Sequence, residues 1–138
     1  MIEESYVSFD TARMLKESGF EANLKTRYVE EEKDEWAFWE SGTKRSDYNY
    51  FDDTIACPTQ ALAARWLREK HKIHVGADMA YSKLVAEKWI YQIRFTDSIG
   101  NPYKSVGWFN DYEEALEAGL QEAIKLIRSK DYAEDNVQ

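Results

Sequence analysis

The fold is decided by residues 89–128, which read WIYQIRFTDSIGNPYKSVGWFNDYEEALEAGLQEAIKLIR. From Trp89 to Phe95 large apolar residues occupy every second position, which is typical of a strand with one buried face. Residues 97–102 contain Gly, Asn and Pro and predict a turn, after which residues 103–109 alternate again. From residue 111 onward a capping-box spacing of Asp and Glu precedes apolar residues at helical spacing. The stretch therefore predicts an antiparallel strand pair followed by a helix.

The residues just before this stretch add a helix and a strand. Pro58 or Thr59 opens a helix that runs to about residue 71, and residues 73–81 then alternate as a strand. The core stripe predicted for this helix consists of Leu62, Ala63, Trp66 and Leu67. Residues 57–130 therefore predict an α-β-β-β-α arrangement.

The first 56 residues predict a helix and a hairpin. Ser8 caps a helix over residues 9–18, and strand-like segments within residues 24–40 flank the acidic run 30–35, which we expect to form the turn. Residues 41–56 predict a long connection with at most one short strand.

The whole pattern predicts a single α+β domain over residues 1–138. We expect an antiparallel sheet with the helices packed on one face, in the order α-β-β-α-β-β-β-α. Residues 1–56 form its acidic, aromatic-rich part, residues 57–130 its α-β-β-β-α part, and residues 131–138 a frayed tail.

Composition limits the class of protein. Of the 138 residues 43% are hydrophobic and 14% aromatic, so material for a core is plentiful. A single cysteine excludes an internal disulfide, which removes any need for an oxidising compartment. The N-terminus has no apolar leader segment, and nowhere do about 18 apolar residues run together. We therefore expect a cytoplasmic protein without membrane association.

The charge is unevenly distributed. Residues 1–56 carry 7 basic and 14 acidic side chains, residues 57–110 carry 8 and 4, and residues 111–138 carry 3 and 8. The net charge of −8 disfavours general affinity for nucleic acid, because the phosphate backbone attracts Lys and Arg. Only the middle of the chain is basic, and it is the segment where such an affinity would reside.

No set of residues in the sequence has the spacing of a known catalytic or metal site. Cys57 is the only thiol, and nothing in the local sequence ties it to a base, so a buried structural role is the commoner interpretation. The spacing of His71 and His74 straddles the predicted helix end and completes no zinc pattern. A carboxylate cluster lies in the polar connection but matches no calcium loop, and consists of Asp47, Asp52 and Asp53. The sequence therefore predicts no enzyme, no cofactor and no metal.

A basic surface is a better candidate. Arg65 and Arg68 lie three residues apart on the predicted 58–71 helix, opposite its apolar stripe, and Lys72 follows one turn later. Arg94 lies on the polar side of its strand, and together with Lys70 and His74 it would extend a surface able to contact phosphates. The alternative interpretation is a solvated helix face.

Aromatic residues in the N-terminal part are the other candidate. Trp36 shares one face of its predicted strand with Phe38, whereas Trp39 lies on the opposite face, so both faces are at least partly apolar. One face meets the core, and the other meets the 41–56 segment, a second copy of the chain or a partner. With Tyr48 and Tyr50 these tryptophans form a candidate protein interface, because Trp and Tyr are common interface anchors.

Three segments carry a resemblance. They are VSFDTA at residues 7–12, PTQALAARWLREKHKI at residues 58–73 and YEEALEAGLQEAI at residues 112–124. The chain resembles small uncharacterised proteins found in phages and prophages of gut Bacteroidetes, and this resemblance implies a mobile-element context without an activity. The α-β-β-β-α order also resembles double-stranded-RNA-binding folds in topology alone.

Two functions follow as expectations. The first is a non-enzymatic phage or prophage accessory protein that binds an unknown protein partner or a second copy of itself. The second is a nucleic-acid-binding protein that uses the basic face of the 58–71 helix.

Overall fold

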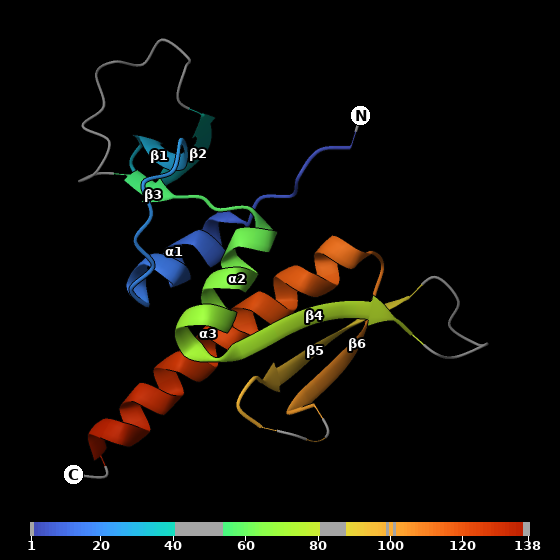
Figure 1. The fold of residues 1–138 in the computed structure, drawn as a ribbon. Helices are drawn as coiled ribbons and strands as arrows, with labels where there is room; N and C mark the ends of the chain where they lie inside the picture. The colour runs from blue at the N-terminus through green and yellow to red at the C-terminus, as the bar shows by residue number, and fades with distance from the viewer. Residues whose placement is uncertain (1, 41–53, 81–87, 99, 101, 137–138) are drawn as a thin grey trace. The chain divides into compact units, whose positions relative to one another are not determined.

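The computed structural model describes residues 2–40, 54–80, 88–98, 100 and 102–136, with side chains to residue 129. The described residues form three helices and six strands, and the strands form two antiparallel three-stranded sheets (Figure 1). The chain divides into two compact units, residues 1–59 and residues 60–138. The prediction of an α+β fold with antiparallel strands and helices packed on strands is confirmed, with the strands divided between two sheets.

Unit 1 is a three-stranded sheet with one helix. Its strands β1 (Thr26–Glu32), β2 (Glu35–Glu40) and β3 (Thr54–Ala56) lie in the order β2-β1-β3, and α1 (Phe9–Glu17) packs on β3. The side chain of Ser8 accepts a hydrogen bond from the Thr11 backbone at 3.2 Å and caps α1 as predicted. The fully or nearly fully buried apolar side chains of this unit include Val7, Ala12, Leu15, Phe20, Val29 and Ile55.

The β1–β2 hairpin turns more tightly than the sequence indicated. We expected the whole acidic run 30–35 to form the turn, but the two strands continue to Glu32 and Glu35, which are register partners. Only Lys33 and Asp34 connect them, and Asp34 has a φ of 64°, a left-handed conformation that Asp tolerates better than most residues. The glutamates therefore belong to the ends of the two strands, and their side chains remain exposed to solvent.

Unit 2 has the predicted α-β-β-β-α order. It consists of α2 (Gln60–His71), β4 (Ile73–Met79), β5 (Trp89–Phe95), β6 (Lys104–Phe109) and α3 (Tyr112–Asn136), with the strands in the order β4-β5-β6. Both helices pack on β4 and on each other, and α3 also packs on β5 and β6. Each strand pairs antiparallel with the next strand in the chain; β4 and β5 pair in continuous register, whereas the β5–β6 register shifts between Trp89 and Ile90.

The sheet of unit 2 has one covered and one open face. Val75 and Ile93 are register partners on the covered face and are 3% and 0% exposed. Their neighbours Arg94 and Ser105, on the other face, are exposed, as alternation along a strand requires. Burying a side chain such as Ile93 contributes about 1.5–3 kcal/mol, so this pattern determines which face meets the helices.

The helices of unit 2 differ in detail from the prediction. On α2 the buried residues are Gln60, Ala63, Ala64 and Leu67, whereas Leu62 and Trp66 of the predicted stripe are half-buried. Ala63 and Ala64 are both buried, and α2 packs against both β4 and α3. The α3 helix continues through the predicted tail to Asn136, since no Gly or Pro interrupts that segment. Its predicted start is correct, with the Asp111 carboxylate accepting from the Glu114 backbone at 2.7 Å.

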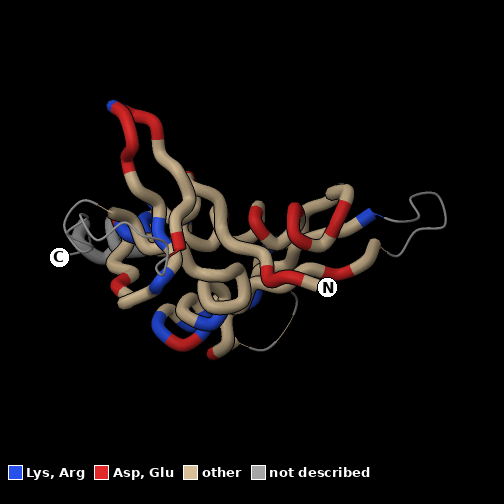
Figure 2. Tube along the Cα trace, turned by 90° about the horizontal axis from the view of Figure 1, so that it is seen from above, with Lys and Arg blue, Asp and Glu red and all other residues tan. Residues whose placement is uncertain are grey.

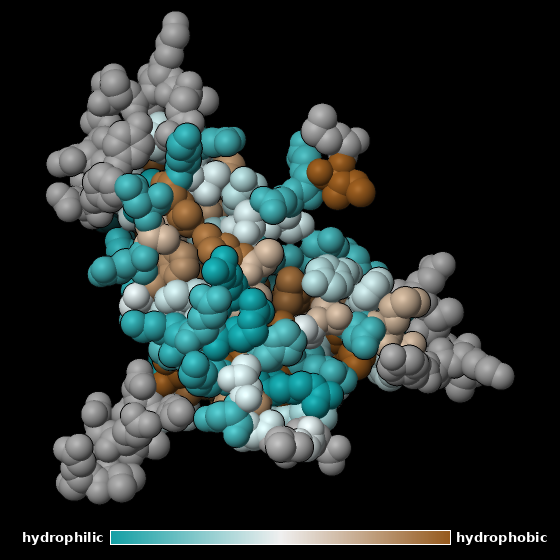
Figure 3. Space-filling view, in the orientation of Figure 1, coloured by the Kyte–Doolittle hydropathy of each residue, from teal (hydrophilic) through white to brown (hydrophobic). Residues whose placement is uncertain are grey.

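The surface of the described part is mainly hydrophilic in the view of Figure 3, where hydrophobic side chains appear in small groups. None of the described helices has the length and apolar character that a membrane crossing requires.

Gly119 lets α3 lie unusually close to the sheet. A Cβ atom on this residue would lie 2.8 Å from Val75 Cγ1, and 3.0 and 3.1 Å from the Cβ and Cγ atoms of Tyr91. Real Cβ atoms essentially never approach a neighbour within 3.0 Å, so with any larger residue here the helix or the side chains of Val75 and Tyr91 must shift.

We predict that Gly119→Ala destabilises the protein by about 1 kcal/mol, because an overpacking cost of ~1–3 kcal/mol exceeds the ~1 kcal/mol gain in helix propensity. Urea unfolding followed by circular dichroism measures the change. In a Val75→Ala background, which removes the nearest atom, the same substitution should cost less. A rise in stability on Gly119→Ala in the unaltered chain would contradict the close packing.

Candidate functional site

Five aromatic side chains of unit 1 meet on one side of the β1–β2 hairpin. Tyr28 and Phe38 are register partners, and their rings lie 6.0 Å apart. Trp36 lies two residues before Phe38, on the same side, and stacks on Phe9 of α1 at 5.2 Å. Tyr6 adds a ring 5.1 Å from Phe38. We call these five residues the aromatic surface.

The aromatic surface is held in place and partly open to solvent. The Tyr28 hydroxyl donates a hydrogen bond to the Val7 carbonyl at 3.0 Å, which joins the sheet to the N-terminal segment. Phe38 is 45% exposed and Tyr6 is 39% exposed, whereas Phe9, Tyr28 and Trp36 are half-buried. A set of rings that is ordered by its own contacts binds a partner with little loss of conformational entropy.

The other face of the hairpin is mostly buried and offers little surface to a binding partner. Trp39 is 6% exposed and faces the same side of the sheet as Val29, which is 1% exposed. The sequence placed Trp39 among the candidate interface residues, and its burial removes it from that set, since a core-facing ring offers no contact surface. Tyr48 and Tyr50 of the same prediction lie outside the described residues.

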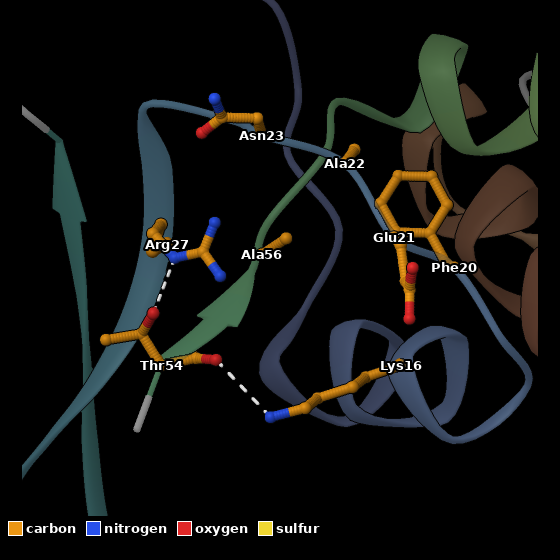
Figure 4. Close-up of a pocket in the computed structure, with 8 residues that line it drawn as sticks. All are labelled: Lys16, Phe20, Glu21, Ala22, Asn23, Arg27, Thr54 and Ala56. Carbon is orange, nitrogen blue, oxygen red and sulfur yellow. Dashed lines mark hydrogen bonds between the residues drawn. The ribbon is translucent and has the colours of Figure 1, made fainter. Parts of the chain in front are cut away.

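A pocket of about 480 Å³ lies between α1, β1 and β3 (Figure 4). Arg27 is 5% exposed, and its Nε atom donates to the Thr54 hydroxyl at 2.5 Å. The Lys16 ammonium donates to the Thr54 carbonyl at 3.4 Å, so Thr54 accepts from both cations (Figure 4). Burial lowers the pKa of the Arg27 guanidinium from its ordinary value. These bonds join α1 and β1 to the short strand β3, which is a structural role that the sequence did not indicate.

Acidic side chains border the aromatic surface. Glu30 is the register partner of Trp36, so its carboxylate extends from the same side of the hairpin. The hairpin then continues with further exposed acids, as Figure 2 shows for its outer part, and these are Glu31, Glu32, Asp34 and Glu35. The hairpin side of the aromatic surface therefore carries negative charge.

The basic residues predicted for unit 2 lie in two places. Arg65 and Arg68 are both exposed on α2, but Arg65 forms an ion pair with Glu69 at 3.0 Å. Lys72 follows α2 in a left-handed conformation with a φ of 60°. Its carbonyl accepts from the Thr96 backbone at 2.9 Å, which brings Lys72 to the end of β5 near Arg94.

The candidate catalytic residues are divided between the two units, with Cys57 in unit 1 and His71 and His74 in unit 2. Cys57 is fully buried, and its sulfur lies 3.4 Å from the Val7 carbonyl. The His71 ring packs edge-on against Trp66 at 4.7 Å, while His74 lies on β4. No group of three His, Cys, Asp or Glu side chains able to hold a metal occurs among the residues described. The aspartates of the predicted carboxylate cluster, Asp47, Asp52 and Asp53, lie outside these residues.

Comparisons with protein-family models, with curated proteins and with solved structures find no match for this chain.

We predict that the Cys57 thiol does not react with a thiol-specific reagent in the folded protein, because its side chain is 0% exposed and packed against the Val7 carbonyl. When an aromatic disulfide reagent is added, the folded protein should release no coloured thiol over minutes. The protein unfolded in denaturant should release one equivalent. Fast labelling of the native chain would restore Cys57 as a candidate nucleophile.

Proposed function

We propose that this protein acts by binding another protein, and that the aromatic surface of unit 1 makes the contact. The resemblance to phage and prophage proteins adds the proposal that it is a non-enzymatic accessory protein of such an element. The observation that carries the proposal is the ordered cluster of five partly exposed rings, since Trp and Tyr supply much of the binding energy at protein interfaces.

The charges next to the rings favour a basic partner. Glu30 lies next to the aromatic surface, further exposed acids follow along the hairpin, and residues 1–56 carry twice as many acidic as basic side chains. The cluster also already holds one guanidinium, because the Arg13 Cζ atom lies 5.9 Å from the centre of the Phe9 ring. A partner segment that combines arginine or lysine with apolar side chains therefore complements this surface in both charge and chemistry.

A second copy of this chain complements the surface less well. Two acidic hairpins would face each other across such a contact, and like charges that are brought together at an interface cost free energy. The net charge of −8 adds a general repulsion between copies.

We predict that Phe38→Ala weakens binding of a basic, apolar peptide at least about tenfold, as expected for the loss of an interface anchor. Peptides are selected from a displayed library on the wild-type protein, and the affinity of the best binders is measured by fluorescence. The matched control is Tyr112→Ala, which removes an aromatic ring of similar exposure, 42%, from unit 2.

Selected peptides should be rich in Arg or Lys, and Glu30→Gln should weaken their binding and reduce its dependence on salt. Acidic or neutral selections, or equal losses in Phe38→Ala and Tyr112→Ala, would contradict the proposal. Dimerisation of the wild type that Phe38→Ala abolishes would make the occupant a second copy instead of a basic partner.

Nucleic-acid binding by unit 2 is the second candidate function. The hydrogen bond between Thr96 and Lys72, together with the pairing of β4 and β5, gathers Lys72, His74 and Arg94 at one end of the sheet. Arg68 lies one helical turn before Lys72 and is exposed. This grouping is consistent with the basic balance of residues 57–110, although the charge of the whole chain limits the affinity.

A further inference from the structure

The open face of the unit 2 sheet ends in a small pocket of about 370 Å³. His74 comes from β4 and Arg94 from β5, where they are register partners and therefore lie side by side. Phe95 at the end of β5 also lines the pocket, and the connection from β5 to β6 supplies the remaining lining residues, which are Thr96, Ser98, Gly100 and Tyr103. The volume is within the range of small-ligand sites.

Arg94 gives the pocket its charge. Its guanidinium donates to the Gly100 carbonyl at 3.2 Å, and it forms no ion pair with a carboxylate of the described residues. Gly100 has a φ of 135°, a conformation that only glycine adopts readily, so the turn that presents this carbonyl depends on glycine. One hydrogen bond positions the guanidinium, and a guanidinium has five N–H donors in all.

The other lining groups suit a phosphate. The Thr96 and Ser98 hydroxyls and the His74 imidazole add hydrogen-bonding groups, and no Asp or Glu lines the pocket within the described part of the chain. Lys72 does not line the pocket, but its backbone carbonyl accepts a hydrogen bond from the Thr96 backbone, so it is a near neighbour of the lining residues. Several donors around a guanidinium match the oxygens of a phosphate group, which Arg binds in a bidentate manner.

Tyr103 supplies a surface for a planar ring. Its side chain is 55% exposed, and its ring meets Phe95 edge-on at 5.1 Å, a contact that orients it beside the pocket. Bases of single-stranded nucleic acids stack on such rings without regard to sequence.

We propose that this pocket binds a phosphate group together with the base next to it, as found in a single-stranded nucleic acid or a free nucleotide. The proposal rests on the second candidate function and is independent of the aromatic surface of unit 1.

Fluorescence anisotropy of a labelled twelve-residue oligothymidylate at low salt tests the proposal. We expect binding by the wild type and a loss of about tenfold on Arg94→Ala, because a charge-assisted hydrogen bond to phosphate is removed. Arg94→Lys should recover part of the affinity, and Tyr103→Ala should weaken binding without changing its salt dependence. Removing Arg94 should also make the slope of log affinity against log salt shallower by about 0.7 for each phosphate that its guanidinium neutralises.

Lys125→Ala is the matched control, because it removes an exposed charge from α3, on the helical layer of the unit, and should leave the affinity unchanged. Circular dichroism confirms that every variant is folded. Thymidine monophosphate and inorganic phosphate, added as competitors, distinguish a free nucleotide from a single-stranded nucleic acid as the ligand. Competition by the monophosphate alone shows that the pocket binds one nucleotide unit. Competition by neither shows that it requires the polymer.

The outcomes separate the two proposals. If Arg65→Ala with Arg68→Ala weakens binding while Arg94→Ala and Tyr103→Ala do not, nucleic-acid binding stands and the pocket is overturned. If the wild type binds none of the three probes at micromolar protein, both are overturned. Equal losses of affinity in Arg94→Ala and Lys125→Ala would show that binding depends on the total charge and not on the pocket, and would also overturn the proposal.

Discussion

The close approach of α3 to the sheet at Gly119 is the constraint on which unit 2 depends. The helix carries no Cβ at the point where it crosses Val75 and Tyr91, and the two surfaces meet at van der Waals distance there. Burial raises the pKa of the Tyr91 phenol, and the Lys104 ammonium holds a hydrogen bond from β6 to Glu122 of α3 at 2.9 Å. The buried apolar residues of this sheet, Ile73, Val75, Tyr91 and Ile93, come from β4 and β5.

The opposite face of the same sheet carries the polar side chains His74, Gln92 and Arg94. Because alternation sends every second residue outward, His74 and Arg94 emerge as neighbours on the open face. The turn after β5 then folds Thr96 and Ser98 around them. The net charge of the chain is negative, yet this end of unit 2 gathers basic groups. The local charge here is therefore opposite in sign to the charge of the whole chain.

Unit 1 differs from unit 2 because its hairpin carries apolar side chains on both sides. One side carries the rings of the aromatic surface, and the other carries Trp39 and Val29, which are buried. The short strand β3 is joined to β1 and α1 through Thr54, which accepts hydrogen bonds from Arg27 and Lys16. An ordered aromatic cluster beside an acidic hairpin is the feature of this unit that a binding partner would meet.

Periodicity in the sequence alone determined the α+β class, the α-β-β-β-α order of unit 2, and the caps at Ser8 and Asp111, because each of these depends on residues that are near one another in the chain. It also correctly placed Trp36 and Phe38 on one strand face. It did not reveal that Tyr6 and Phe9 complete the aromatic surface, that Trp39 is buried, or that Arg27 bonds to Thr54. Those facts depend on strand register and on which element covers which face, so they bring together residues up to several tens of positions apart. The sequence supplied the candidate residues, and only the tertiary structure decided which of them are neighbours.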